Sequence, residues 1–361
     1  MNAIVATDVA AVQAAVAEGV PLIPVAGGTK TATHPVPEGE VRALDVSGLT
    51  GVVDYDPAEL TFTARPGTTL AEIDAMLAAN GQQLPFDPPR LGEAGTIGGA
   101  VAAGLTGPGG FAAGIRDFVV GVRFVDGSGR VAAGGGRVVK NAAGFDLPKL
   151  LVGSLGRLGV IVGLSLKVFP RPEATATVRF PAAGLPAGLA ALAALARGPI
   201  PLSALDLDPD GAVTARIGGS AESIEARTAR LARALEPLGA PLEDEAAHWE
   251  QACRFAWVEG RARLVVVPTA PRHVVDLDAE LERRGAGRRY GLAANVAWVA
   301  WPQATSLDEL SELLAARGMS GVVLTGPPLP EPLIGAATGG AFGRRIAAAL
   351  DPAGVFAGGR R

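Results

Sequence analysis

The chain has 361 residues, more than one ordinary hydrophobic core accommodates, so we expect two domains of unequal size. Hydrophobic residues make up 48% and charged residues 19% of the sequence, and this composition excludes a disordered chain. The net charge is −4, and acidic and basic residues are interspersed, so the sequence gives no basis for nucleic-acid binding.

The single cysteine, Cys253, excludes an internal disulfide and an iron–sulfur cluster built by this chain alone, which needs about four cysteines. We interpret it as a buried structural thiol. The first residues lack the basic segment and apolar run of a signal peptide. The most apolar stretches, such as 160–169, are far shorter than a membrane span of about 20 residues. We therefore expect a cytoplasmic protein without a transmembrane segment, which reaches the inner face of a membrane only through partners.

The first elements are a helix and short strands. Asp8 is placed to cap a helix with an apolar valine face that ends near Gly19. An apolar strand then runs into the glycine pair Gly27-Gly28. Strands are expected over residues 22–25, 42–46 and 60–64.

A capping box, Thr69-Leu-Ala-Glu72, begins the next predicted helix, and Asn80-Gly81 ends it. A proline-rich extended segment follows and leads to Gly95-Thr96-Ile97-Gly98-Gly99, which opens directly into a helix of small residues. Residues 119–125 and 130–133 flank a turn and predict a β-hairpin. Residues 160–169 alternate as a half-buried strand, and Pro170-Arg171-Pro172 marks a domain boundary.

Beyond residue 174 the pattern changes to helices alternating with strands, which is typical of helices packed on one sheet. Helices are expected near 185–196, 221–235, 246–258, 274–284 and 307–316, and strands near 202–207, 213–217, 264–267, 293–300 and 321–324. A last helix over 339–350 precedes a turn that docks the C-terminus. We therefore divide the chain into residues 1–172, 173–335 and 336–361.

Two glycine-rich loops carry the chemistry. Consecutive glycines after a strand let several amide N–H groups converge, and such a nest binds anions. Ala26-Gly27-Gly28-Thr29-Lys30 has this form, with a hydroxyl and an ammonium added. The loop Gly95–Gly99 runs into a helix, so its amides add to the positive end of the helix dipole. Two such cradles suit a diphosphate.

The two loops do not match the other common phosphate-binding motifs. The first loop lacks the register of a Walker loop, and the dinucleotide fingerprint G-x-G-x-x-G does not occur. Either glycine pair alone is equally well explained as a turn. The later segments Lys140–Asp146 and Gly153–Ile161 favour a flat ligand, because glycines spaced three apart allow close backbone approach and Val160 and Ile161 can pack on a ring.

The glycine-rich motifs follow one another in a recognisable order: Ala26-Gly27-Gly28-Thr29, Gly95-Thr96-Ile97-Gly98-Gly99, Arg116-Asp117-Phe118, Lys140-Asn141-x-x-Gly144-Phe145-Asp146 and Gly153-Ser154-x-Gly156-x-Leu158-Gly159-Val160-Ile161. This order resembles the FAD-binding domain of the vanillyl-alcohol-oxidase (PCMH-type) flavoproteins. Within that family, Gly104-Leu105-x-Gly107-Pro108 and the closing Leu350–Phe356 element are most similar to the FAD-binding subunits of bacterial glycolate oxidases.

The resemblance implies an α+β fold: a two-lobed PCMH-type FAD-binding domain, then an α/β cap domain, with the C-terminus returning to the FAD domain. It implies that Gly27, Gly28 and Thr29 hold the pyrophosphate, that Thr96–Gly99 line the pyrophosphate, ribityl chain and flavin, and that Gly159–Ile161 contact the adenine or flavin. The wider set of cofactor-binding residues that it implies is Ala26, Lys30, Pro89, Gly95, Ile97, Gly104, Gly107, Arg116, Asp117, Lys140, Gly144, Phe145, Asp146, Gly153, Gly156, Val160 and Ile161.

Some family members tether the flavin through a histidine in the first loop. Thr29 stands in that loop here, so we expect non-covalent FAD, with His34 as the alternative tether. Family members often end in Asn-Pro-Gly-Arg beside the flavin, whereas this chain ends in Gly358-Gly359-Arg360-Arg361, which leaves the asparagine contact without a counterpart.

Oxidation of a 2-hydroxy acid needs a base, which is usually histidine, and a cation for the carboxylate. We interpret His248 as a packed or surface residue and His273 as a helix cap or exposed residue, and we expect no metal site. The arginines Arg254, Arg261 and Arg263 are interpreted as a solvated face or subunit contact, with a carboxylate grip as the alternative. No catalytic residue is assigned.

The leading hypothesis is an FAD-bearing subunit of a glycolate oxidase complex that converts glycolate to glyoxylate. The resemblance implies two partners, a catalytic flavoprotein subunit and an iron–sulfur subunit. A self-sufficient FAD-dependent dehydrogenase of another 2-hydroxy acid or sugar alcohol is the alternative. A third hypothesis is a structural subunit that has lost FAD.

Overall fold

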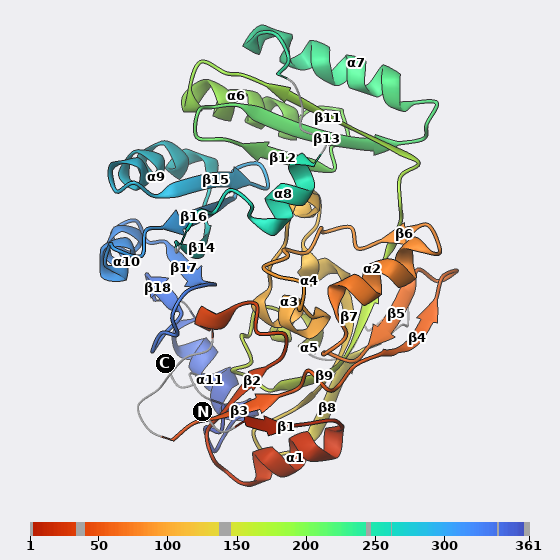
Figure 1. The fold of residues 1–361 in the computed structure, drawn as a ribbon, viewed down its shortest axis with the longest axis vertical. Helices are drawn as coiled ribbons and strands as arrows, with labels where there is room; N and C mark the ends of the chain where they lie inside the picture. The colour runs from red at the N-terminus through yellow and green to blue at the C-terminus, as the bar shows by residue number, and fades with distance from the viewer. Residues whose placement is uncertain are drawn as a thin grey trace.

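The structure is a computed structural model that describes residues 3–33, 40–136, 146–242, 247–260, 262–337 and 339–356. It consists of an N-terminal lobe, built from residues before 172 together with the C-terminal end, and a second lobe over 174–335 (Figure 1). The expected α+β fold is confirmed, whereas the domain boundaries stay a prediction. In the described ranges, no helix is long and apolar enough to cross a membrane.

The N-terminal lobe begins with a parallel sheet in the order β1 (Ala3–Val5), β3 (Arg42–Asp45), β2 (Leu22–Val25). Helix α1 (Val9–Ala17) packs against it, and the Asp8 carboxylate caps this helix by accepting from the Ala11 amide at 2.8 Å. The C-terminal end lies beside β2, because the Leu22 amide donates to Val355 and Phe356 is buried there. This layer brings the carboxyl ends of β2 and β3 to one edge.

The second layer of this lobe is an antiparallel sheet in the order β4-β5-β9-β7-β8. Its core is aromatic and aliphatic, with Phe62, Phe124 and Leu166 fully buried. The strands are β4 (Val52–Asp56), β5 (Thr61–Ala64), β7 (Val119–Val125), β8 (Val131–Gly135) and β9 (Val160–Lys167). The helices of this layer are α2 (Leu70–Ala78), α3 (Ile97–Ala103), α4 (Ile115–Phe118) and α5 (Leu147–Leu151). The short segments are η1 (Thr31–Thr33), η2 (Pro108–Phe111) and the strand pair β6 (Gln82–Gln83) with β10 (Phe169–Pro170).

The second lobe is one antiparallel sheet in the order β11-β13-β12-β15-β16-β14-β17-β18. Its strands are β11 (Ala174–Phe180), β12 (Ala204–Leu207), β13 (Val213–Gly219), β14 (Arg263–Pro268), β15 (Gly287–Gly291), β16 (Val296–Trp301), β17 (Ser320–Val323) and β18 (Leu333–Gly335). Its helices are α6 (Leu185–Ala196), α7 (Ile224–Leu235) with η3 (Glu236–Leu238), α8 (His248–Arg254), α9 (Pro271–Arg283) and α10 (Leu307–Ala315), and α11 (Gly340–Leu350) returns to the N-terminal lobe.

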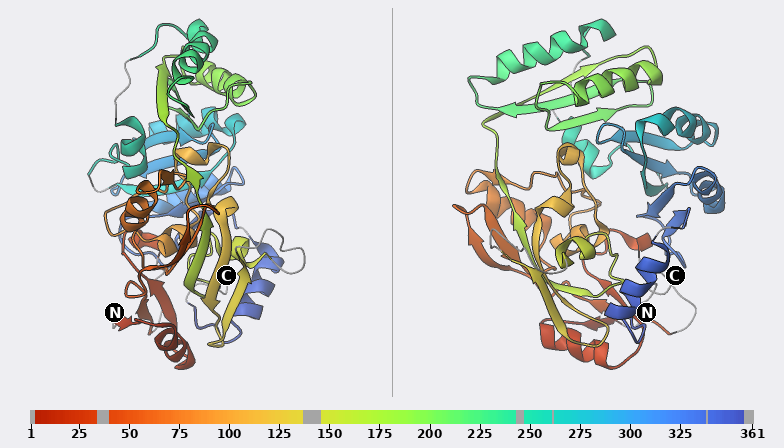
Figure 2. Two further views of the ribbon diagram at one scale, coloured as in Figure 1. Left: turned by 90° about the vertical axis from the view of Figure 1, so that its right-hand side faces the viewer. Right: turned by 180° about the vertical axis from the view of Figure 1, so that it is seen from behind.

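The two faces of this sheet have different neighbours (Figures 1 and 2). Leu205, Val265 and Trp301 point to the face that α6, α7, α9 and α10 cover. Leu264 and Trp298 point to the opposite face and pack with residues of the N-terminal lobe. Helix α8 lies on this inner face, against η2. The inner face of the sheet therefore forms part of the boundary between the lobes.

Two elements have other bounds than the sequence predicts. The strand expected over 293–300 begins at Val296, because Leu292, Ala293 and Ala294 have φ angles of 54°, 55° and 62°. These angles belong to the left-handed region and exclude a strand. The helix expected over 246–258 is the shorter α8, which ends where Phe255 adopts φ 55°. Strands β1, β4, β6, β11, β15 and β18 were not predicted.

Candidate cofactor site

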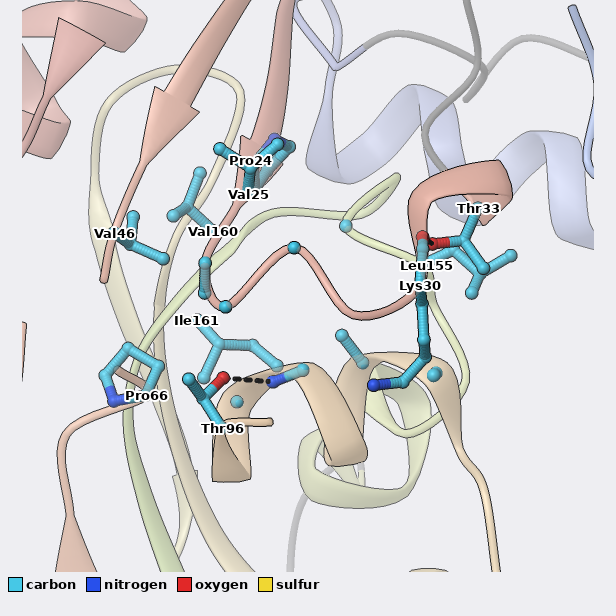
Figure 3. Close-up of a pocket in the computed structure, with 18 of the residues that line it drawn as sticks. Pro24, Val25, Lys30, Thr33, Val46, Pro66, Thr96, Leu155, Val160 and Ile161 are labelled. Carbon is cyan, nitrogen blue, oxygen red and sulfur yellow. Dashed lines mark hydrogen bonds between the residues drawn. The ribbon is translucent and has the colours of Figure 1, made fainter. Parts of the chain in front are cut away.

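A hollow of about 750 Å³ opens where β2 and β3 end and α3 begins (Figure 3). The crevice outside the carboxyl ends of parallel strands is a common place for such sites. The lining residues are Pro24, Val25, Ala26, Gly27, Gly28, Thr29, Lys30, Thr33, Val46, Pro66, Thr96, Gly98, Gly99, Ala102, Ala103, Leu155, Gly156, Gly159, Val160 and Ile161.

The first loop passes over the start of α3 (Figure 3). It requires glycine at two neighbouring positions, for a different reason at each. A Cβ atom added at Gly27 would lie 1.6 Å from the carbonyl oxygen of Ala94, so no larger residue fits. Gly28 has φ +62°, which favours glycine, and a Cβ there would meet no atom within 4 Å. The second glycine therefore leaves open space that a ligand can fill.

The amides of this first loop are free to bind a ligand. Within the described part of the chain, the N–H groups of Gly27, Gly28, Thr29 and Lys30 donate no hydrogen bond. Backbone amides that stay unpaired are uncommon, and a run of them forms a nest that binds anions. The first loop thus has the donor geometry that a phosphate needs.

The start of α3 contributes differently from what the sequence led us to expect. The Ile97 amide donates to Thr68, the Gly98 amide to Pro66, and the Gly99 amide to the Thr96 hydroxyl at 3.1 Å. These amides are therefore already paired within the protein. A Cβ at Gly98 would lie 2.5 Å from the Pro66 ring. The glycines of the second loop serve close packing rather than donation.

Lys30 brings a positive charge into the hollow. Its Nζ lies 3.4 Å from the Thr29 hydroxyl and points across the hollow toward α3 (Figure 3). None of the described acidic side chains forms an ion pair with it. Burial lowers the pKa of Lys30 to about 8. A buried ammonium without a counterion favours an anionic ligand beside it.

The wall of the hollow on the side away from Lys30 is apolar. Gly159 has φ +152°, and a Cβ there would lie 2.6 Å from the Phe124 ring, so only glycine brings the chain this close. Val160, Ile161 and Pro66 line the side of the hollow away from Lys30 (Figure 3). Such a wall can pack against a flat ring.

The structure brings together Ala26–Lys30, Thr96, Gly98, Gly99, Gly156 and Gly159–Ile161 of the expected cofactor-binding residues. The others lie elsewhere. Ile97 is fully buried, the Gly95 carbonyl accepts from Leu70, and Gly104 ends α3 in close contact with Gly153. Asp117, next to Arg116, accepts from the Gly114 amide, and Asp146 caps α5. Pro89 and Gly107 line a second hollow. Lys140, Gly144, Phe145, Arg261 and His34 lie outside the described residues.

Sequence reasoning missed several lining residues. Pro24 and Leu155 adjoin the glycine motifs, so a wider window around each motif would have included them. Val46 and Pro66 follow other strands and reach the hollow only through the tertiary fold. No local sequence signal distinguishes them from ordinary loop residues.

The other candidate residues lie away from this hollow. His248 is buried edge-on against Trp249, and His273 accepts a hydrogen bond from Arg272 at 3.0 Å. Arg254 pairs with Glu93 at 2.5 Å and with Glu250 at 3.0 Å. Burial raises the pKa of Cys253 to about 12, so this thiol stays protonated. These contacts account for His273 and Arg254 without a ligand.

The hollow fits a dinucleotide with a diphosphate. Free amides and a buried ammonium lie on one side, and an apolar wall lies on the other. Residues 5–134 match the family model described as an FAD binding domain. The chain carries an FAD-binding domain. FAD is thus its cofactor, as the resemblance of the motifs implies.

Several curated proteins are similar to this FAD-binding protein over part of its length. Over 186 residues it is 44% identical to the glycolate oxidase subunit GlcE of Escherichia coli (strain K12), which covers 51% of this chain and 53% of that protein. It is 31% identical over 160 residues to the glycolate oxidase subunit GlcD of Bacillus subtilis (strain 168), covering 44% and 34%. It is 32% identical over 166 residues to a mitochondrial D-lactate dehydrogenase (cytochrome) of Arabidopsis thaliana, covering 45% and 29%. The chain thus spans about half the length of the first relative and about a third of the others.

The fold has a counterpart among solved structures. An alkyldihydroxyacetonephosphate synthase superposes with a TM-score of 0.70, at 16% sequence identity, over 98% of this chain and 76% of that one. At this identity the likeness concerns the fold alone. It extends over both lobes, whereas the family match covers only the N-terminal lobe.

Proposed function

We propose that this chain is the FAD-binding subunit of a glycolate oxidase complex that oxidises glycolate to glyoxylate. The observation that carries the proposal is the hollow in which the free amides of Gly27–Lys30 and the Lys30 ammonium face the start of α3. The name of the E. coli relative, a glycolate oxidase subunit, supports the substrate.

Different residues of the hollow would bind the diphosphate and the ring of FAD. The first-loop amides and Lys30 bind the diphosphate, because both favour negative charge. Val160, Ile161 and Pro66 pack against a ring and exclude water from it. Bound FAD supplies a hydride acceptor for the oxidation of an alcohol carbon.

The proposed binding is non-covalent. The first loop offers Thr29 and Lys30 to the ligand and no histidine. Acid precipitation of the purified protein should therefore release the flavin into the supernatant. Flavin that stays with the precipitated protein would show a covalent link, and His34 would then be the first residue to substitute.

The proposed partners are a catalytic flavoprotein subunit and an iron–sulfur subunit. The chain has one cysteine, too few for an iron–sulfur cluster, so further electron transfer needs another protein. The similarity to both a GlcE and a GlcD subunit supports an assembly of related flavoproteins.

Purification of the chain alone tests this proposal. We expect a yellow protein with the absorbance of oxidised flavin, which reduces a dye with glycolate only after the partner subunits are added. A colourless protein that takes up no FAD would contradict the proposal. Bleaching of the flavin by glycolate in the isolated chain would instead favour a self-sufficient dehydrogenase.

A further inference from the structure

Helix α11 lies at the edge of the N-terminal lobe and is the least buried of the longer helices (Figures 1 and 2). Each of the other described α-helices of nine or more residues buries at least two side chains, whereas the 11 residues of α11 bury none. Its inner side is half-buried, and Leu350 packs there against the core of the antiparallel sheet. The opposite side of the helix is exposed.

The exposed side of α11 combines an aromatic ring with two cations. Phe342 is 73% exposed, the largest fraction among the large hydrophobic side chains of the described chain. Arg344 and Arg345 are exposed too, and neither forms an ion pair with a described residue. Aromatic residues and arginine are enriched at protein–protein interfaces. The outer face of α11 consists of these three side chains and the exposed alanines Ala341, Ala348 and Ala349.

Helix α11 has little to stabilise it within the chain. Isolated helices shorter than about 12–15 residues are marginal, and most helices in proteins depend on the packing of one face. Gly343 in its interior lowers the helix propensity further. A Cβ atom at Gly343 would meet no atom within 4 Å, so close packing does not explain this glycine. A second protein surface on the outer face would supply the burial that α11 lacks.

The end of α11 is tied to the strand that carries the first loop. Asp351 directly follows the helix, is buried, and accepts from the Val355 and Phe356 amides at 2.8 and 2.9 Å. The Leu22 amide, at the start of β2, donates to the Val355 carbonyl at 2.7 Å. Strand β2 ends at the first loop. A protein bound at α11 would therefore contact the lobe that contains the cofactor hollow.

The charge of the outer face discriminates among the possible occupants. Helix α11 contains no acidic residue, so two copies that met symmetrically through it would place arginines beside arginines. One aromatic ring and two arginines also fall short of the roughly four to eight basic residues typical of binding to anionic lipids. A different protein with carboxylates around an apolar pocket complements the face. Its carboxylates would pair with the guanidinium groups, and its pocket would hold the Phe342 ring.

We propose that the outer face of α11 is the docking surface for a partner subunit that presents carboxylates around an apolar pocket. The proposal rests on the function proposed above, because only a multi-subunit enzyme requires such a surface. It assigns the contact to the N-terminal lobe, beside the strand that leads into the cofactor hollow.

Biolayer interferometry with each purified partner subunit tests the two cations. We expect the double substitution Arg344→Glu and Arg345→Glu to weaken the binding of one partner by about a hundredfold or more, because attraction becomes repulsion. The matched control is Arg230→Glu with Arg233→Glu, which makes the same change in net charge at exposed arginines of α7. It should leave the affinity within about threefold of the wild type. Equal affinities in the two double variants would overturn the docking surface.

The Phe342 ring is tested in the same assay. Phe342→Ala should weaken binding by about tenfold or more, whereas Phe169→Ala, at an exposed phenylalanine of β10, should bind like the wild type. Hydrogen exchange gives a measurement that needs no substitution. The amides of α11 should exchange about tenfold or more slowly once the partner is bound, and those of α7 should not change. Unaltered exchange in α11 would overturn the docking surface.

Two further measurements distinguish the other occupants. Alone, the chain should sediment as a monomer and should not bind vesicles that contain anionic phosphatidylserine. A dimer that Arg344→Glu with Arg345→Glu dissociates would assign the outer face to a second copy. Vesicle binding that the same variant loses would assign it to a membrane surface. Either result contradicts the docking of a partner subunit.

The flavin content of each sample separates the docking surface from the proposed function. All variants should carry FAD like the wild type, because none changes a residue of the cofactor hollow. A chain that carries FAD and binds a partner equally well with and without the α11 substitutions contradicts the docking surface alone. A wild-type chain that takes up no FAD, or that binds neither partner subunit, contradicts the proposed function.

Discussion

Lys30 is the residue on which cofactor binding depends most. Its ammonium is buried beside the free amides of the first loop, and burial lowers its pKa to about 8. A diphosphate placed there would return the favourable interactions that burial removed. The same lysine would explain a preference for FAD over a flavin without phosphates.

We expect Lys30→Met to weaken FAD binding by about ten- to a hundredfold, the effect of losing one charge-assisted contact of about 1.5–3 kcal/mol. Quenching of FAD fluorescence measures the affinity. Lys167→Met, at an exposed position on β9, is the control and should bind FAD like the wild type. If both variants bind alike, Lys30 lies away from the phosphates.

The pKa of Lys30 also gives a pH dependence. The free protein loses the ammonium as the pH rises through about 8, whereas a bound diphosphate holds the proton and raises this pKa. FAD affinity should therefore fall above about pH 8 in the wild type and stay level in Lys30→Met. The same fall in both proteins would assign the titration to another group.

At the scale of single residues, the sequence predicts the parts of the cofactor site that lie close together along the chain. The first loop could be recognised because Gly27 and Gly28 follow a strand directly. Pro66 and Val46 could not, because only the meeting of two sheets places them in the hollow.

Helix starts set the shape of the cofactor site at the scale of elements. Thr96 caps α3 by accepting from the Gly99 amide, and Thr69 caps α2 in the predicted capping box, accepting from the Glu72 amide at 3.1 Å. The Thr69 cap was predicted from the sequence because capping is a local interaction, whereas Thr96 was expected only to line the cofactor. Strand β15 was not predicted, because its Arg288 is unusual in a sheet. The Arg288 guanidinium is held by the Asp278 carboxylate of α9 at 2.7 and 2.8 Å.

The two caps form a matched pair for experiment. Thr96→Val and Thr69→Val should each lower the free energy of unfolding by about 1 kcal/mol, measured by urea denaturation. Thr96→Val should also weaken FAD binding, by about fivefold or more, because it disturbs the helix start that faces Lys30. An equal loss of FAD affinity in both variants would mean that stability, and not the site, is responsible.

At the scale of the whole molecule, the lobes are joined by contacts that are distant in sequence. The Ala32 amide donates to Leu324, the Arg90 amide donates to Cys253, and Arg157 beside the cofactor hollow pairs with Glu331. The Arg157 side chain is only 12% exposed, so this ion pair is well shielded from solvent. No sequence pattern predicts such pairs, because each depends on the docking of both lobes.

We expect the two lobes to unfold together because of these contacts. Scanning calorimetry should show one transition, and FAD at about a hundred times its Kd should add about 2.7 kcal/mol of stability to it. Two transitions, of which FAD moves only one, would contradict the coupling of the lobes and leave the cofactor site unaffected.

The central claim is that this chain binds FAD through a diphosphate site made by the free amides of Gly27–Lys30 and the Lys30 ammonium. Titration of the flavin-free protein with FAD and with riboflavin tests it most directly, because only FAD carries the diphosphate. We predict one FAD bound per chain, with an affinity about a hundredfold or more above that of riboflavin. Equal affinities for FAD and riboflavin, or no binding of FAD, would contradict the account.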